Sequence, residues 1–445
     1  MNNCKVIVKN KQGIIFLLLV FLCFLFYIRD LHEYDIGKMI IVLPIIFTCL
    51  FASKENLYYL IALLLPLGWG VSVAYIYPII VILLYLRKNG PVVRCLTIAV
   101  FIGLYEILHY LVYPLPGGRF EPSVISTLVC VTFFTSYLIF NNNEVCNKDK
   151  FVLFFCIGTA VFLVFILLHS VKLYGLLGVL SGVYRLGDSG ITNEMEETDI
   201  IFFRANANYV SYYSSACITF VMILLRRKTI PLVLASVLLI VYLCAGFSTQ
   251  SRTWFLTVVL FFICFAFSFK RYRTIALMGV ALFGVIVIYI ALKFDDIIEA
   301  YLTRFSFDDP NSTMAEYGGR PELIKLFNDY LASHIDALIW GVGVNGQPLI
   351  CKVDNGATKG FRAPHNAIQQ IIVCYGLIGL YFYIVPFFKR IAKLYKKYRP
   401  GFIYILPLII VMIILQTIQI LYPPLLMAPL IPAVYLFTIK NNNAQ

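Results

Sequence analysis

Long, uninterrupted runs of apolar residues recur along the whole chain. Most are long enough to cross a bilayer as an α-helix, and they are continuous, whereas the strands of a membrane barrel would alternate apolar and polar residues. Three of the runs are short, so the pattern predicts about 12–14 membrane spans. The sequence therefore predicts an all-α, polytopic transmembrane helix bundle, with runs at residues 14–28, 38–52, 56–68, 71–86, 92–113, 122–140, 151–169, 207–225, 229–247, 251–269, 273–292, 364–388, 401–421 and 425–438.

Composition excludes a soluble globular protein. The 445 residues are 61% hydrophobic and 13% charged, whereas soluble domains carry about 25% charged residues. The first run follows Lys5, Lys9 and Lys11 as a secretory signal would, but no small-residue cleavage site comes after it. We therefore expect a retained first helix.

The lysines and arginines predict the orientation of the chain. If the N-terminus is cytoplasmic and the helices alternate, the cytoplasmic segments receive most of the basic residues and only three acids, Glu55, Glu144 and Asp149. This places both termini in the cytoplasm and the large loops on the outer face of the membrane. The net charge of +13 then lies mostly in short loops facing anionic lipid headgroups, and no nucleic-acid partner is expected.

Two outer loops contain most of the length outside the membrane. This arrangement divides the chain into N-terminal helices (1–169), a periplasmic loop (170–206), central helices (207–292), a large periplasmic loop (293–363) and C-terminal helices (364–445). No P-loop is present, so nucleotide-driven chemistry is not expected.

The large loop contains one amphipathic helix. It starts after Gly318-Gly319 with Arg320 and Pro321, a residue suited to a first helical turn. We expect it to end at Gly341 and to place its apolar face on the membrane surface or on neighbouring helices. That face consists of Leu323, Ile324, Leu326, Phe327, Tyr330, Leu331, Ile335 and Leu338.

Polar clusters with arginines lie at four predicted helix starts on the outer face. A helix N-terminus carries unpaired N–H groups and a partial positive charge, and arginine adds a bidentate donor, so together they suit a phosphate. A helix that needs only a cap would use Ser, Thr, Asp or Asn. The clusters predict an anion site made of Arg204 and Asn208, Arg252, Arg320, and Arg362, His365 and Asn366.

Simpler interpretations of these residues stay open. A single arginine at a helix mouth often anchors the helix at the interface, Asn208 and Asn366 could be ordinary caps, and His365 could be a satisfied polar residue. Glu106 and His109 share one face of a helix and could form a proton relay, although we favour a near-surface pair.

No metal, cofactor or disulfide is expected. Asp295-Asp296 and Asp308-Asp309 could hold a metal, but loop acids are more often solvated, and His169 and Lys172 look interfacial. Of the 12 cysteines, only Cys351 lies clearly in an outer loop, so a disulfide framework is not predicted.

Taken in order, the motifs over about residues 200–385 resemble the O-antigen polymerase and O-antigen ligase superfamily. In many members an aromatic residue follows the loop arginine, where this chain has Ile324 and Phe327. The motifs are Asn206-Ala207-Asn208, Thr249-Gln250-Ser251-Arg252, Gly319-Arg320, Gly341-Val342-Gly343, and His365-Asn366 followed by Gly376 and Gly379.

The resemblance implies a metal-independent glycosyltransferase of the membrane type, acting at the periplasmic face of the inner membrane. Its donor would be a glycan on undecaprenyl pyrophosphate, and its other partners membrane lipids, a chain-length regulator and a flippase. Arg252 and Arg320 would hold the pyrophosphate, and His365 would act as general base. Arg204, Asn208, Asn366 and Arg362 would bind the substrate.

Three functions remain in view. We favour the polymerase, which transfers the growing glycan onto a lipid-linked repeat unit, because the sequence as a whole is idiosyncratic. The ligase, which transfers the finished glycan to lipid A core, needs the same residues. A transporter or flippase of lipid-linked oligosaccharide would need polar residues deep in several spans, and Glu106 and His109 are the best examples.

Overall fold

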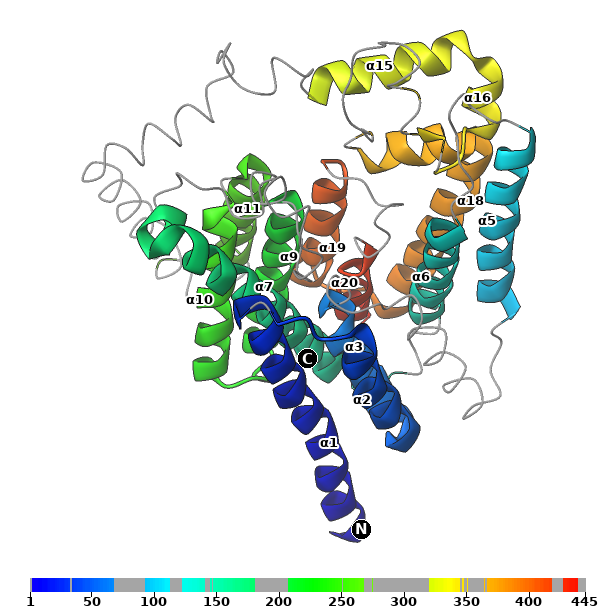
Figure 1. Cartoon of the computed structure of the whole chain (residues 1–445). Coiled ribbons are helices and arrows are strands. Elements are labelled where there is room, and N and C mark those ends of the chain that lie inside the picture. The colour runs from blue at the N-terminus through cyan, green and yellow to red at the C-terminus, as the bar shows by residue number, and fades with distance from the viewer. Residues whose placement is uncertain are drawn as a thin grey trace.

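The protein is described by a computed structural model in which every regular element of the described part is a helix (Figure 1). The described residues are 2–32, 34–67, 93–112, 122–140, 145, 147–180, 207–249, 251–267, 274, 320–344, 346–347, 350, 364, 366–417 and 427–438. The longer helices are α1 (Asn2–Phe26), which continues into the π-helix η1 (Tyr27–Leu31), α2 (Lys38–Phe51), α3 (Lys54–Leu67), α5 (Val93–Val112), α6 (Pro122–Phe140), α7 (Lys148–Leu180), α9 (Ala207–Arg226), α10 (Leu232–Ser248), α11 (Arg252–Phe267), α15 (Arg320–Ser333), α16 (Ile335–Trp340), α18 (Ala367–Tyr398), α19 (Phe402–Leu415) and α20 (Leu430–Phe437).

The predicted helical membrane bundle is confirmed. In the described part of the chain, 4 helices are long and apolar enough to cross a membrane: Gly13–Leu31, Lys148–Leu176, Ala207–Arg226 and Ala367–Tyr398. Shorter apolar helices lie in the predicted runs 38–52, 92–113, 122–140, 229–247, 251–269 and 401–421. Helices α3 and α20 lie in runs 56–68 and 425–438. Run 71–86, and run 273–292 apart from residue 274, lie outside the described residues.

Helix α7 is longer than the sequence predicts. The sequence places the start of the first outer loop at residue 170, but α7 continues to Leu180 and changes direction at Gly175, whose φ is +74°. The two residues of α7 that the sequence indicates as interfacial, His169 and Lys172, have partners in the π-helix η1 that follows α1. The ring Nδ1 of His169 lies 3.1 Å from the Asp30 carbonyl oxygen, and Lys172 Nζ donates to Leu31 O at 2.8 Å.

The core of the bundle is the contact between α3 and α7, the most extensive helix pair in the described part. Every residue of α3 from Asn56 to Leu67 is buried. Gly158 of α7 lets the two backbones approach, because a Cβ added there would lie 2.1 Å from the carbonyl oxygen of Leu63. Small residues allow this close packing of membrane helices.

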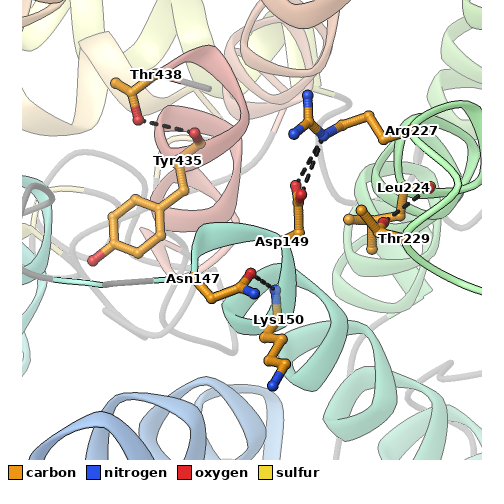
Figure 2. Close-up of polar contacts among 8 residues, drawn as sticks. All are labelled: Asn147, Asp149, Lys150, Leu224, Arg227, Thr229, Tyr435 and Thr438. Atoms are coloured by element: carbon orange, nitrogen blue, oxygen red, sulfur yellow. Dashed lines mark hydrogen bonds and ion pairs between the residues drawn. The ribbon is translucent and has the colours of Figure 1, made fainter. Parts of the chain in front are cut away.

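Segments predicted to be cytoplasmic contact one another, among them the residues after α9 and at the start of α7 (Figure 2). Arg227, just after α9, donates to both carboxylate oxygens of Asp149 at 3.1 and 3.2 Å. Lys148 Nζ, at the start of α7, donates to Thr438 Oγ1 at 2.7 Å and lies 5.3 Å from the ring centroid of Tyr398, the last residue of α18. The chain reversals expected on one side of the membrane therefore share one side of the structure.

The ion pair at this end affects the ionisation of its arginine. Partial burial by itself would lower the pKa of Arg227, but the neighbouring Asp149 carboxylate outweighs that effect and raises it above its ordinary value. The guanidinium therefore stays charged and keeps α9 joined to α7.

The close approach at Gly158 gives a stability prediction. Alanine normally favours a helix over glycine by roughly 0.5–1 kcal/mol, but overpacking costs about 1–3 kcal/mol, so Gly158→Ala should lower the Tm of the purified protein in detergent. The control is Gly13→Ala, because a Cβ at Gly13 meets no atom within 4 Å. Equal melting temperatures for the two variants would contradict the close contact.

Candidate functional site

Helices α9 and α11 start at the same end of the bundle, at the top of Figure 1. Thr257 Oγ1 of α11 lies 3.3 Å from Ser215 Oγ of α9, so the N-terminal halves of the two helices are in contact. Arg252 is the first residue of α11 and its side chain is exposed. Ser251, just before it, caps the helix by accepting a hydrogen bond from the Trp254 amide at 3.4 Å. The cap and the cation at this helix start are thus separate residues.

Helix α15 crosses the top of the molecule above the first part of α18 (Figure 1). Gln369 Nε2 of α18 donates to the carbonyl oxygen of Ile324 at 2.9 Å and to Asn328 Oδ1 at 3.0 Å, both on α15. Asn366 caps α18, because its Oδ1 accepts from the Gln369 amide at 3.0 Å. Arg320 is the first residue of α15, so the starts of α15 and α18 belong to one hydrogen-bonded unit.

The amphipathic character predicted for the large loop is confirmed, but the helix is divided. The apolar face packs on Val373 of the neighbouring helix α18. The first part of the predicted helix, α15, ends at Ser333. His334 has non-helical dihedral angles, and α16 then continues to Trp340, where the predicted stop at Gly341 is confirmed. The buried residues of this face are Leu323, Phe327, Tyr330, Leu331 and Ala337.

Helix α18 is broken at Gly376, whose φ is +63°. Two carbonyl groups near the break accept hydrogen bonds from the outer loop instead of from α18 itself. The Val342 amide donates to Val373 O, and the Gly343 amide donates to Cys374 O, each at 2.8 Å. The segment after α16 is therefore docked on the exposed backbone of a broken membrane helix.

Only glycine permits this docking. A Cβ on Gly341, whose φ is +81°, would lie 2.3 Å from the carbonyl carbon of Cys374. A Cβ on Gly376 would lie 2.1 Å from the carbonyl oxygen of Ile339. Both are far shorter than ordinary contacts, so the two backbones touch directly.

Helix α5 holds the other side of the same loop segment. The Val344 amide donates to the two carboxylate oxygens of Glu106, at 2.9 and 3.2 Å. The ring Nε2 of His109 lies 3.0 Å from the carbonyl oxygen of Trp340 and 3.1 Å from that of Gly341. Exposed fractions are 2% for Glu106 and 8% for His109, so both side chains are buried beneath the loop.

The interpretation of Glu106 and His109 as a near-surface pair is therefore wrong. Sequence reasoning also missed Tyr105, whose hydroxyl donates to Trp340 O at 2.6 Å, and Gln369. The available signal was the presence of ionisable residues inside an apolar helix, which commonly marks a functional position. The partners of Glu106 and His109 lie more than 200 residues away in the chain, so no local pattern indicates what these two side chains bind.

The other predicted site residues are placed only in part. Asn208 lies in the first turn of α9, and its carbonyl oxygen accepts from Ser211 Oγ at 2.8 Å. The backbone of Arg320 is described as the first residue of α15. Arg204, Arg362, His365 and the aspartate pairs at 295–296 and 308–309 lie outside the described residues. His365 immediately precedes Asn366, the cap of α18.

Comparison with known protein families matches residues 235–384 to the family described as O-antigen ligase. The match begins in α10 and ends in α18, so it includes Arg252, Arg320, the glycine segment 341–343 and His365. No curated protein and no solved structure gives a significant match to the chain. The family finding agrees with the resemblance predicted from the ordered motifs.

The break in α18 predicts the effect of Gly376→Ala. Alanine in the left-handed region costs about 1–2 kcal/mol, and here its Cβ would also collide with Ile339 O. The matched control is Gly175→Ala, since Gly175 also has a positive φ, of +74°, but a Cβ added there would meet no atom within 4 Å. We expect Gly376→Ala to lower the Tm in detergent more than Gly175→Ala does. A larger loss for the Gly175 variant would contradict the docked geometry.

Proposed function

Because residues 235–384 match the O-antigen ligase family, whose members are glycosyltransferase-like enzymes, we propose that this chain is an O-antigen polymerase. It transfers a growing glycan from undecaprenyl pyrophosphate onto a lipid-linked repeat unit. The observation that carries the proposal is the position of the match. It spans three of the four arginine clusters, and the described helix starts within it lie at one end of the bundle (Figure 1).

The proposed reaction needs a general base for the acceptor hydroxyl and positive groups that bind the pyrophosphate leaving group. It does not need a metal. His365 takes the proton from the attacking sugar hydroxyl, which its near-neutral ordinary pKa suits. Arg252 and Arg320, each the first residue of a helix, bind the pyrophosphate. Bidentate guanidinium groups and helix N-termini both stabilise the negative charge that grows as the lipid diphosphate departs.

The remaining predicted residues hold the donor. Asn366 already uses its Oδ1 to cap α18, so its contact with the glycan goes through the amide nitrogen. Arg204, Asn208 and Arg362 complete the proposed binding surface. A chain-length regulator and a flippase are the proposed protein partners, because a polymerase must receive translocated repeat units and stop at a defined length.

We place the site on the periplasmic side of the bacterial inner membrane, with both termini in the cytoplasm. Two features support this orientation. The basic segment after α9 contacts the start of α7 through Arg227 and Asp149 (Figure 2), and the start of α7 contacts the end of α18 through Lys148 and Tyr398, as the bias of cytoplasmic loops towards lysine and arginine requires. Helices α15 and α16 lie at the opposite end (Figure 1).

The ligase is the second candidate, favoured by the description of the matching family. It would use the same donor and the same arginines and histidine, and only the acceptor would differ. A flippase is less well supported, because Glu106 and His109, its best candidate path residues, bind the backbone of the outer loop.

Substitution of the proposed catalytic residues tests the site. Arg252→Ala, Arg320→Ala and His365→Ala should each reduce O-antigen chain extension by at least about 10²-fold, the scale on which loss of one charge-stabilising group acts. The measurement is the lipopolysaccharide banding pattern of a deletion strain that carries each variant, with membrane levels checked by immunoblot. Lys325→Ala is the control, because Lys325 is an exposed cation of α15. Full activity in two of the three variants would eliminate the proposed site.

The deletion strain itself separates the two transferases. Loss of a polymerase should leave lipid A core carrying a single repeat unit, because ligation of one unit still proceeds. Loss of a ligase should leave no glycan on the core and should retain polymer on the lipid carrier. The second pattern would overturn the polymerase in favour of the ligase.

A further inference from the structure

Helix α5 contacts the site region from outside the matched domain. The family match starts at residue 235, whereas α5 spans Val93–Val112. Three residues of α5, within about one helical turn, nevertheless bind the backbone between residues 340 and 344: Tyr105, Glu106 and His109. This contact links the two halves of the chain at the end of the bundle where the site is proposed.

Glu106 is suited to hold a backbone amide in place. Its side chain has two oxygens within 3.2 Å of the Val344 nitrogen, so this amide has an acceptor. A buried amide without an acceptor is costly because water does not replace the lost bond. The side chain therefore stabilises one position of the loop and disfavours others.

His109 holds the preceding carbonyl groups. Its Nε2 lies within 3.1 Å of the oxygens of Trp340 and Gly341, and its Nδ1 lies 2.8 Å from the Tyr105 oxygen in its own helix. The ring thus lies between the Tyr105 carbonyl oxygen of α5 and the carbonyl oxygens of the loop, and a neutral ring donates to only one of these two sides. Glu106 and His109 bind amide and carbonyl groups of one short segment, which determines its direction as well as its place.

The held segment in turn fixes the first part of α18. The amides of Val342 and Gly343 bind the carbonyls freed at the break, and that part of α18 begins at Asn366, the residue after His365. Gln369, in the same part, binds α15, which begins with Arg320. A continuous set of hydrogen bonds therefore joins α5 to the helix starts that carry two of the proposed catalytic residues.

We propose that Glu106 and His109 are positioning residues of the transferase, which act by holding segment 340–344 against the broken α18. This inference rests on the proposed function, because the residues positioned are Arg320 and His365. Neither Glu106 nor His109 contacts the glycan. Their loss should slow the chemical step without weakening donor binding to the same degree.

Glu106→Ala tests the inference with two independent readouts on the purified full-length protein. Hydrogen–deuterium exchange measured by mass spectrometry should become at least about tenfold faster at Val342–Val344, because the Val344 amide loses its acceptor and the segment that holds the Val342 and Gly343 amides on α18 loses its support. With a lipid-linked repeat unit as substrate, kcat should fall by roughly 10²-fold, the cost of a misplacement near 1 Å, while KM stays close to wild type. His109→Leu should act in the same direction.

Two further variants give the controls. Glu106→Gln keeps an acceptor oxygen, so it should restore slow exchange and most of kcat. Leu108→Ala alters an α5 side chain that is 55% exposed and should change neither readout. If Glu106→Ala does not accumulate, Gly343→Ala takes its place, because its Cβ would lie 3.1 Å from Glu106 Oε2 and 3.2 Å from His109 Cβ and would press the loop off α5.

The outcomes separate this inference from the proposed function. Unchanged exchange in Glu106→Ala, or faster exchange with wild-type kcat, overturns the positioning role while the transferase remains. A protein with slow wild-type exchange but no glycan transfer overturns the proposed function, and the positioning role with it. A rise in KM equal to the fall in kcat/KM would place Glu106 in donor binding and also overturns the inference.

Discussion

A backbone group that loses its helical partner inside a membrane must find another one, because the hydrocarbon offers none. The break at Gly376 frees carbonyl groups of α18, and the amides of Val342 and Gly343 bind them. The end of the bundle that contains α15 and α16 is organised around this exchange of partners. It explains the close approach at Gly341, the turn that follows α16, and the reason that an extramembrane loop is tied so firmly to a membrane helix.

The same requirement accounts for the polar side chains of α5. The loop that satisfies α18 has backbone groups of its own, and Glu106, His109 and Tyr105 bind those on its other side. The result is a layered arrangement in which side chains of α5 hold the loop, and the loop holds α18. Charged residues at the far end of the bundle serve a simpler purpose, since Arg227 and Asp149 join α9 to α7 where loops emerge from the bilayer.

Much of the fold could be predicted from the sequence, because a membrane helix needs a continuous apolar run and the runs are plain. The amphipathic helix of the large loop was visible for a similar reason, through the spacing of Leu323, Phe327 and Leu331. Partners distant in the chain were not visible. Lys172 was interpreted as interfacial, and its carbonyl acceptor at Leu31 was not indicated by the sequence. Glu106 was favoured as part of a near-surface pair, and its bond to the Val344 amide was not indicated either. Of the proposed site, the sequence predicted Arg252 at a helix start and Asn366 as either ligand or cap, and the structure shows the cap.

The complete burial of α3 bears on how the protein is made. Residues Asn56–Leu67 of α3 are enclosed by other helices in the finished bundle, yet α3 leaves the ribosome well before α7, its main neighbour. During synthesis it must wait in the bilayer, with Asn56 exposed to hydrocarbon or at its edge, until α7 arrives. Biogenesis therefore passes through an incomplete assembly that depends on timely insertion of the next helices, and a nascent chain that stalls before α7 would be a substrate for membrane quality control.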